Sequence, residues 1–306
     1  MIFRNIVPAL AFTLFPLLVT SMVPAGAALA QPRAVVELFT SQACAACPPM
    51  DSCIAKLADD PSILTLTLPV DYWDYTGWHD TLALNINSRR QRAYAEMRGD
   101  HRILTPQAII NGTHVVEGHD RQSLRRIIRE SKEHNTAPSI PVSLQQNGDD
   151  IEVYLPHAHL GEAGAEIWVC PVKSSVTVDI GGGENEGRTL TYTNVVRGWV
   201  KLADWNGTAT KERTPLSALG MQDADSLAVL VQPRASKAPG SILGAALIPI
   251  TPPQKVEPTN GQPISSGHLS SEHTSIAPEA TRSITQPALD TPVSTPQLPA
   301  SAQPAK

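Results

Sequence analysis

Residues 34–57 read AVVELFTSQACAACPPMDSCIAKL. The apolar run at 34–39 predicts a central strand, because both of its alternating faces are apolar. After Cys47, apolar side chains recur at three-and-four spacing, which predicts a helix. Between the strand and the helix lie two cysteines separated by two alanines, where unpaired backbone N–H groups and the helix dipole can stabilise a thiolate. The stretch therefore indicates a reactive dithiol.

The first thirty residues have the features of a secretory signal peptide. Arg4 precedes an apolar run, and Ala28-Leu29-Ala30 supplies small residues for cleavage, so we expect the mature chain to begin at Gln31. An uncleaved anchor is the alternative, but the run is shorter than the roughly 20 apolar residues that span a membrane. We expect a periplasmic or secreted protein with no membrane span after cleavage, in an oxidising compartment.

Composition and length limit the remaining possibilities. The chain has 306 residues and a formal net charge of −5, which gives no reason to expect nucleic acid as a partner. After about residue 251 it contains no aromatic residue and is dominated by Pro, Ser, Thr, Ala and Gln, which is typical of a disordered tail. We expect a signal peptide at 1–30, an α/β domain at 31–137, an all-β sandwich-like domain at 138–250 and a tail at 251–306.

The first half alternates strand and helix. An apolar strand at 63–70 follows the dithiol helix and completes a βαβ unit with a parallel pair. A helix is predicted at 87–97, and Asn111-Gly112 predicts a hairpin between strands near 105–110 and 114–116. Asp120 is a predicted N-cap for a last amphipathic helix at 123–134.

An aromatic run, DYWDYTGWHD at residues 71–80, follows the second strand. Ligands of open α/β sheets bind at this end of the strands. The run either lines a substrate groove beside the dithiol or fills the core as packing. The candidate substrate-binding residues are Tyr72, Trp73, Tyr75 and Trp78.

The same run contains Asp71, Asp74, His79 and Asp80, which resemble a metal-ligand cluster. It has no helical His pair and no second histidine at a useful offset. We therefore expect neither a metal nor another cofactor here.

Short strands and turns replace this pattern from residue 140 onward. The predicted strands are 142–144, 151–155, 165–172, 176–180, 189–203, 227–232 and 242–250. Their spacing predicts a β-sandwich. Gly181-Gly182-Gly183 lacks the lysine and the helix of a phosphate loop, so we interpret it as a flexible turn. Glu184, Asn185 and Arg188 are interpreted as hairpin hydrogen-bonding residues, with a small polar site as the alternative.

The first half resembles the thioredoxin fold, in which a CxxC dithiol follows the first strand and a proline opens the third. The resemblance implies that Pro106 is a cis-proline facing the dithiol and that the Thr105 backbone pairs with substrate. An ordinary trans proline at the first residue of a strand is the alternative.

A closer resemblance is to an uncharacterised family of secreted, thioredoxin-like bacterial proteins. It rests on four motifs: ELFTSQxCxxCPP at 37–49, DYWDYxGW at 71–78, TPQ at 105–107 and GENxGRTL at 183–190. The resemblance spans roughly residues 34–250. It implies the fold of the first half and leaves the activity open.

The dithiol suggests roles for three residues. Cys44 is expected to be the exposed, attacking thiol and Cys47 the resolving thiol. The two alanines between them bring no charged donor, so the redox direction stays unpredicted. By the resemblance, Glu37 is the buried acid that moves a proton for the resolving thiol; a carboxylate satisfied by backbone groups is the alternative.

Two further cysteines, Cys53 and Cys170, allow three pairings in all. We expect Cys44–Cys47 as the redox pair and Cys53–Cys170 as a structural disulfide. Two free buried thiols are the alternative.

The predicted function is thiol–disulfide exchange on extracytoplasmic protein substrates, supported by a redox partner and needing no cofactor. One alternative is a copper metallochaperone that binds through its CxxC motif. Another is a non-catalytic binding module in which the disulfide only stabilises the turn and the aromatic run does the recognition.

Overall fold

The computed structural model describes residues 31–131, 133, 136–234 and 239–251. The expected signal peptide and, apart from Thr251, the expected tail lie outside the described residues. Among the described residues, no helix is long and apolar enough to cross a membrane.

The first half is built around β1, which is buried along its whole length. Its elements, in chain order, are β1 (Ala34–Thr40), α1 (Pro48–Ala58), β2 (Ile63–Pro69), the 3-10 turn η1 (Asp74–Thr76), α2 (Asn85–Arg98), β3 (Gln107–Ile110), β4 (His114–Glu117) and α3 (Arg121–Glu130). β1 lies between a parallel partner, β2, and an antiparallel partner, β3. The predicted central strand and the predicted β3–β4 hairpin are therefore confirmed.

Local sequence explains where two of the helices begin. Pro48 is the first residue of α1, where its missing N–H leaves no hydrogen bond unmade. Asp120 caps α3, because its side chain accepts a hydrogen bond of 3.0 Å from the N–H of Ser123. The predicted N-cap is thus confirmed.

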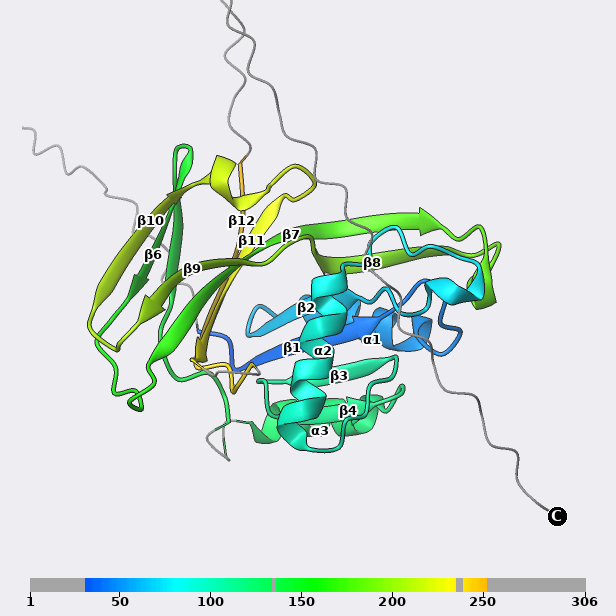
Figure 1. Cartoon of the computed structure of the whole chain (residues 1–306), viewed down its shortest axis with the longest axis horizontal. Helices are drawn as coiled ribbons and strands as arrows, with labels where there is room; N and C mark the ends of the chain where they lie inside the picture. The colour runs from blue at the N-terminus through cyan, green and yellow to red at the C-terminus, as the bar shows by residue number, and fades with distance from the viewer. Residues whose placement is uncertain (1–30, 132, 134–135, 235–238, 252–306) are drawn as a thin grey trace, which may run out of the picture. The chain divides into compact units, whose positions relative to one another are not determined.

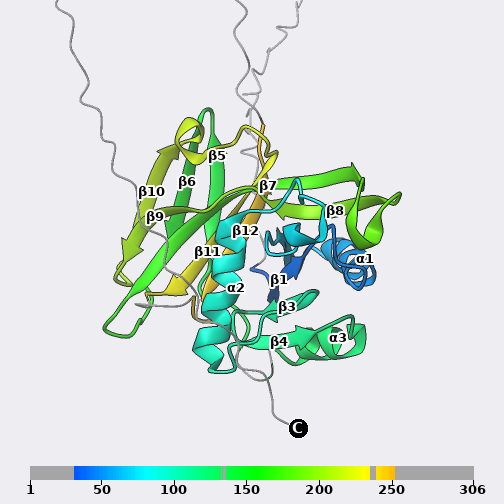
Figure 2. The same cartoon turned by 45° about the vertical axis from the view of Figure 1, so that its right-hand side comes forward.

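Helices cover both faces of this part of the sheet (Figures 1 and 2). Val36 and Leu38 of β1 pack on one face with apolar side chains of α1 and α3. Val35 and Phe39 pack on the other face with Tyr94 of α2. The alternation along β1 thus sends neighbouring residues to two different cores.

The second half adds two layers of strands. Its elements, in chain order, are β5 (Ser143–Asn147), β6 (Asp150–Leu155), β7 (Ala165–Asp179), η2 (Gly183–Asn185), β8 (Thr189–Val196), β9 (Val200–Trp205), β10 (Thr210–Pro215), η3 (Leu216–Leu219), β11 (Ser226–Pro233) and β12 (Gly244–Pro249). A small sheet, β10-β6-β5, shares one apolar cluster with β7, β11 and β12.

The two halves share one sheet, in the order β12-β11-β7-β8-β2-β1-β3-β4 with β9 paired to β7. The junction is a parallel pairing of Thr67 in β2 with Val195 in β8. The described residues all fall within one compact unit, which extends across the expected domain boundary between residues 137 and 138. The reason is the 15-residue β7, which pairs with β9 and β11 through its first half and with β8 through its second.

Candidate functional site

The dithiol lies between the end of β1 and the start of α1. Cys44 and Cys47 form a disulfide, with their Cα atoms 5.5 Å apart. Cys47 is the N-cap residue of α1 and is fully buried, while Cys44 is 2% exposed. The expectation of an exposed Cys44 is wrong for this oxidised state, because segments that are distant in sequence cover the turn.

One covering segment is Thr105-Pro106, directly before β3. The Thr105–Pro106 peptide bond is cis, the geometry that the resemblance implies. The Thr105 carbonyl oxygen lies 3.6 Å from Cys44 Sγ. The Thr105 hydroxyl accepts a hydrogen bond of 2.8 Å from Trp73 Nε1. Thr105 therefore contacts both the dithiol and the aromatic run.

The four aromatic candidates separate into two pairs. Trp73 stacks on Tyr75 with ring centroids 6.2 Å apart, and Tyr75 is 82% exposed. Tyr72 packs on the α2-side core, where burial raises the pKa of its hydroxyl to about 12. The ring of Trp78 lies against the backbone of Gly181. Trp73, which bonds to Thr105, and the exposed Tyr75 stacked on it offer an aromatic surface beside Thr105.

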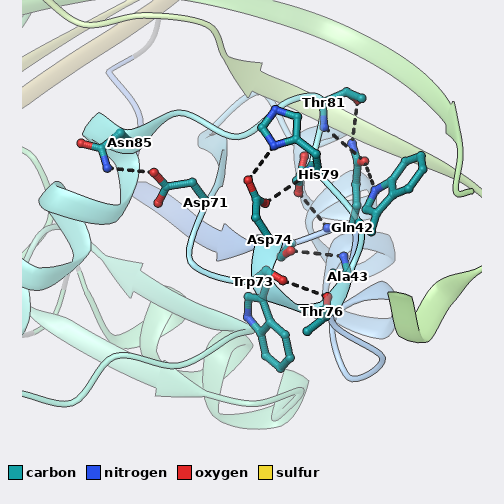
Figure 3. Close-up of polar contacts among 12 residues, drawn as sticks. Gln42, Ala43, Asp71, Trp73, Asp74, Thr76, His79, Thr81 and Asn85 are labelled. Carbon is teal, nitrogen blue, oxygen red and sulfur yellow. Dashed lines mark hydrogen bonds and ion pairs between the residues drawn. The ribbon is translucent and has the colours of Figure 1, made fainter. Parts of the chain in front are cut away.

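The loop that carries these rings is tied to the segment just before the dithiol (Figure 3). Asp80 accepts a hydrogen bond of 2.8 Å from the backbone N–H of Gln42. The Gln42 carbonyl Oε1 accepts one of 2.8 Å from Trp78 Nε1. At the loop surface, His79 Nδ1 lies 2.6 Å from Asp74 Oδ2. Asp74, His79 and Asp80 thus have structural partners, and no group of three or more potential metal ligands occurs in the described part of the chain.

Glu37 does not face α1. It shares the α2-side face of β1 with Val35 and Phe39, and it is fully buried. Its carboxylate accepts hydrogen bonds of 2.6 Å from Arg90 Nε and 2.6 Å from the Tyr94 hydroxyl. The role of proton carrier for Cys47 is therefore misassigned to Glu37, whose carboxylate is one half of a buried ion pair.

A different buried acid lies on the dithiol helix itself. Asp51 follows Cys47 by four residues, so the two side chains lie one above the other on α1. Both carboxyl oxygens of Asp51 are buried and make no hydrogen bond to a described residue. Burial raises the pKa of Asp51 to about 7; the nearby Asp80 adds to the rise, and the Thr40 hydroxyl, close but outside hydrogen-bond geometry, opposes it. Its spacing from Cys47 is visible in the sequence, but its unpaired burial is not.

The expected Cys53–Cys170 disulfide is wrong, because both cysteines are free and buried. Cys53 belongs to the core between the sheet and α1, whereas Cys170 belongs to the core on the α2 side. The sheet separates them. Burial raises the pKa of the Cys170 thiol, so this thiol is held protonated.

The tip of the β7–β8 hairpin also contacts the dithiol turn. Asn185 is buried, and its Nδ2 donates hydrogen bonds of 2.9 Å to the carbonyl oxygens of both Gln42 and Cys44. Arg188 Nη1 donates one of 2.7 Å to Asn185 Oδ1. Glu184 Oε2 accepts one of 2.9 Å from the N–H of Ala45. The sequence favoured hairpin hydrogen bonding for these residues, with a small polar site as the alternative, and it contains no local signal that brings Asn185 to Cys44.

Comparison with known proteins gives a family and no activity. A crystal structure of protein AGR_C_4864 from Agrobacterium tumefaciens is similar, with 31% identity and a TM-score of 0.64, over 71% of this chain and 94% of that one. No functionally curated protein matches the sequence. Residues 35–232 match the family described as "Protein of unknown function (DUF1223)". That match covers more than half of the chain and includes the dithiol, the aromatic run and the hairpin tip, so the chain belongs to the DUF1223 family.

Proposed function

We propose that this protein is a thioredoxin-like thiol–disulfide oxidoreductase that acts on protein substrates outside the cytoplasm. The observation that carries the proposal is the Cys44–Cys47 disulfide at the start of α1, with Cys44 Sγ against the carbonyl of Thr105 and the cis bond to Pro106. The signal-peptide pattern at 1–30 supports the location.

The exchange reaction uses the two cysteines and a thiol reductant. In the reduced protein, the Cys44 thiolate attacks a substrate disulfide, forming a Cys44–substrate bond and releasing one substrate thiolate. Cys47 then attacks the Cys44 sulfur, re-forming the disulfide and releasing the second thiolate. Two electrons pass to the substrate, and a thiol reductant restores the dithiol. The reverse sequence oxidises a substrate dithiol.

Asp51 is the proton carrier for Cys47 in this proposal, replacing Glu37. Its carboxyl lies one helical turn from Cys47, and its pKa of about 7 lets it both accept and release a proton near neutral pH. It accepts the Cys47 proton when that thiol attacks, and returns it when the disulfide is reduced.

Substrate contact is assigned to the surface beside Thr105. The exposed Tyr75 and the stacked Trp73 offer aromatic faces next to the backbone that borders Cys44. Large planar faces of this kind bind apolar side chains of a polypeptide.

One observation favours a second candidate function. Cys44 is only 2% exposed, so a protein thiolate reaches it only after a covering segment has moved. A disulfide that stays closed would be structural, and the protein would then be a binding module that uses Trp73 and Tyr75.

The test is reduction of insulin by dithiothreitol, catalysed by wild type, Cys44→Ser and Cys53→Ala. Cys53→Ala is the matched control, since it removes a buried cysteine that is outside the pair. We expect wild type and Cys53→Ala to accelerate insulin precipitation and Cys44→Ser to show only the uncatalysed rate. Equal background rates in all three proteins would favour the binding module.

A trapping experiment tests the order of attack. Cys47→Ala leaves a Cys44–substrate bond that cannot be resolved, so a mixed disulfide accumulates and is seen by non-reducing mass spectrometry. Accumulation on Cys47 in the Cys44→Ser protein instead would reverse the two roles.

A further inference from the structure

The dithiol turn offers few free N–H groups to a thiolate. Pro48 and Pro49 have no N–H, and the N–H of Cys47 donates to the Cys44 carbonyl at 3.1 Å. The N–H of Ala45 donates to Glu184. Among residues 45–49, this leaves the N–H of Ala46. The usual stabilisation of a thiolate by a helix N-terminus is therefore reduced here.

Glu184 also brings a negative charge to this turn. Its hydrogen bond goes to the residue directly after Cys44, and no described Lys, Arg or His forms an ion pair with it. The nearest cation in sequence, Arg188, donates to Asn185 instead. A carboxylate in this place disfavours a second negative charge on Cys44 and has no such effect on a neutral disulfide.

The contacts of its neighbours hold Glu184 in place beside Ala45. Asn185, the next residue, is buried and holds the carbonyl oxygens of Gln42 and Cys44 with one amide group. Gly183, with φ of 74°, lets the tip approach Ala43, where an added Cβ would lie 3.3 Å from the Ala43 Cβ. The hairpin tip therefore delivers Glu184 to Ala45 in a defined position.

We propose that Glu184 is a positioning residue that stabilises the oxidised pair, so that it lowers the reduction potential of Cys44–Cys47 and directs electron flow from the dithiol to substrates. The inference rests on the proposed function, in that the pair must exchange between disulfide and dithiol. Reduction adds two electrons and two protons, both supplied by a thiol reductant.

The experiment is a redox titration at pH 7 in glutathione buffers, with the dithiol fraction read by thiol alkylation and mass spectrometry. The variants are Glu184→Gln, which keeps a hydrogen-bond acceptor and removes the charge, and Glu186→Gln as a matched control. Glu186 is exposed on the same hairpin tip, and among the described residues its carboxylate forms no hydrogen bond or ion pair with the dithiol turn. Because Glu184 is solvent-exposed, we expect Glu184→Gln to shift the equilibrium toward the dithiol by roughly fivefold, about 20 mV for two electrons, and Glu186→Gln by less than about twofold.

A second measurement reads the thiolate directly. In a Cys47→Ala background, the rate of Cys44 alkylation is followed against pH, with and without Glu184→Gln. Glu184→Gln removes the negative charge beside Cys44, so we expect its alkylation profile to lie at lower pH than that of the unsubstituted background. An unchanged titration and an unchanged profile, or equal shifts in the Glu186→Gln protein, would overturn the proposal.

The two proposals fail separately. Insulin reduction by wild type together with an unshifted Glu184→Gln titration would remove the role of Glu184 and keep the oxidoreductase. A shifted Glu184→Gln titration in a protein that does not accelerate insulin reduction would keep the role of Glu184 and remove the oxidoreductase.

Discussion

At the scale of single residues, Asp51 makes stability depend on pH. Burial raises its pKa from 3.8 to about 7, so the folded protein binds a proton that the unfolded chain has already released. The protonated Asp51 therefore makes its largest contribution to the free energy of unfolding below about pH 4, and this contribution is lost as the pH rises through 7. Asp51→Asn is therefore expected to gain stability at pH 8, by at most about 4 kcal/mol, and little at pH 4.

Urea denaturation between pH 4 and pH 8 measures this effect. Asp59→Asn is the control, because Asp59 is exposed at the end of the same helix. The same pH slope in Asp51→Asn and wild type would show that another group is responsible.

Glu37 belongs to a buried ion pair, with exposed side-chain fractions of 10% for Arg90 and 0% for Glu37. Glu37→Gln leaves the Arg90 charge buried without its carboxylate, and we expect a loss of about 3–5 kcal/mol in unfolding free energy. Glu117→Gln breaks the exposed pair with Arg102 and is expected to cost less than about 1 kcal/mol. Similar losses in the two variants, measured by urea denaturation, would contradict this interpretation.

Sequence spacing was enough to find the dithiol but not the acid beside it. Cys44 and Cys47 were predictable because CxxC before a helix is a local pattern. Glu37 was misassigned because both faces of β1 are apolar, and alternation does not reveal which face α1 covers. Asp51 is local too, four residues after Cys47, but only its unpaired burial distinguishes it from an ordinary helix acid.

At the scale of elements, the β7–β8 hairpin depends on close packing at its tip. A Cβ at Gly181 would lie 2.7 Å from the ring of Trp78, which is held by its hydrogen bond to Gln42. Gly181→Ala is expected to lower the unfolding free energy by about 1–3 kcal/mol, because the ring must move and lose that bond. Gly161→Ala, where no atom lies within 4 Å of the new Cβ, is the control. Thermal unfolding measures both, and equal midpoints would contradict the prediction.

Elements with strong local signals were predictable, and β10 was not. Asn111-Gly112 marked the β3–β4 hairpin, and Asp120 marked the start of α3. The strand Thr210–Pro215 reads TKERTP and has no apolar alternation, so nothing in it predicts a strand. It forms because it pairs along its whole length with β6.

At the scale of the whole molecule, the continuous sheet predicts one folding unit. A fragment of residues 31–137 loses β8, the partner of β2, and also loses Cys170, Val172 and Ala228 from the α2-side core. We expect this fragment to lack cooperative thermal unfolding and residues 31–251 to unfold in a single transition. Thermal unfolding followed by circular dichroism tests both. Cooperative unfolding of the 31–137 fragment would show that this part folds as a separate domain.

The change from two expected domains to one unit has a specific cause. The runs at 165–172 and 176–180 looked like two strands, because Ser174-Ser175 interrupts the apolar pattern. The structure makes them one strand, and long-range pairing of this kind leaves no local signal.

The contact between Glu184 and Ala45 also concerns how the protein is made. The two residues are 139 positions apart, so a chain growing at 5–20 residues per second makes Glu184 on the order of 10 s after Ala45. During synthesis the cysteine turn therefore exists before its cover does. A disulfide that forms between Cys44 and Cys47 before the chain is complete therefore forms without the Glu184 carboxylate beside it.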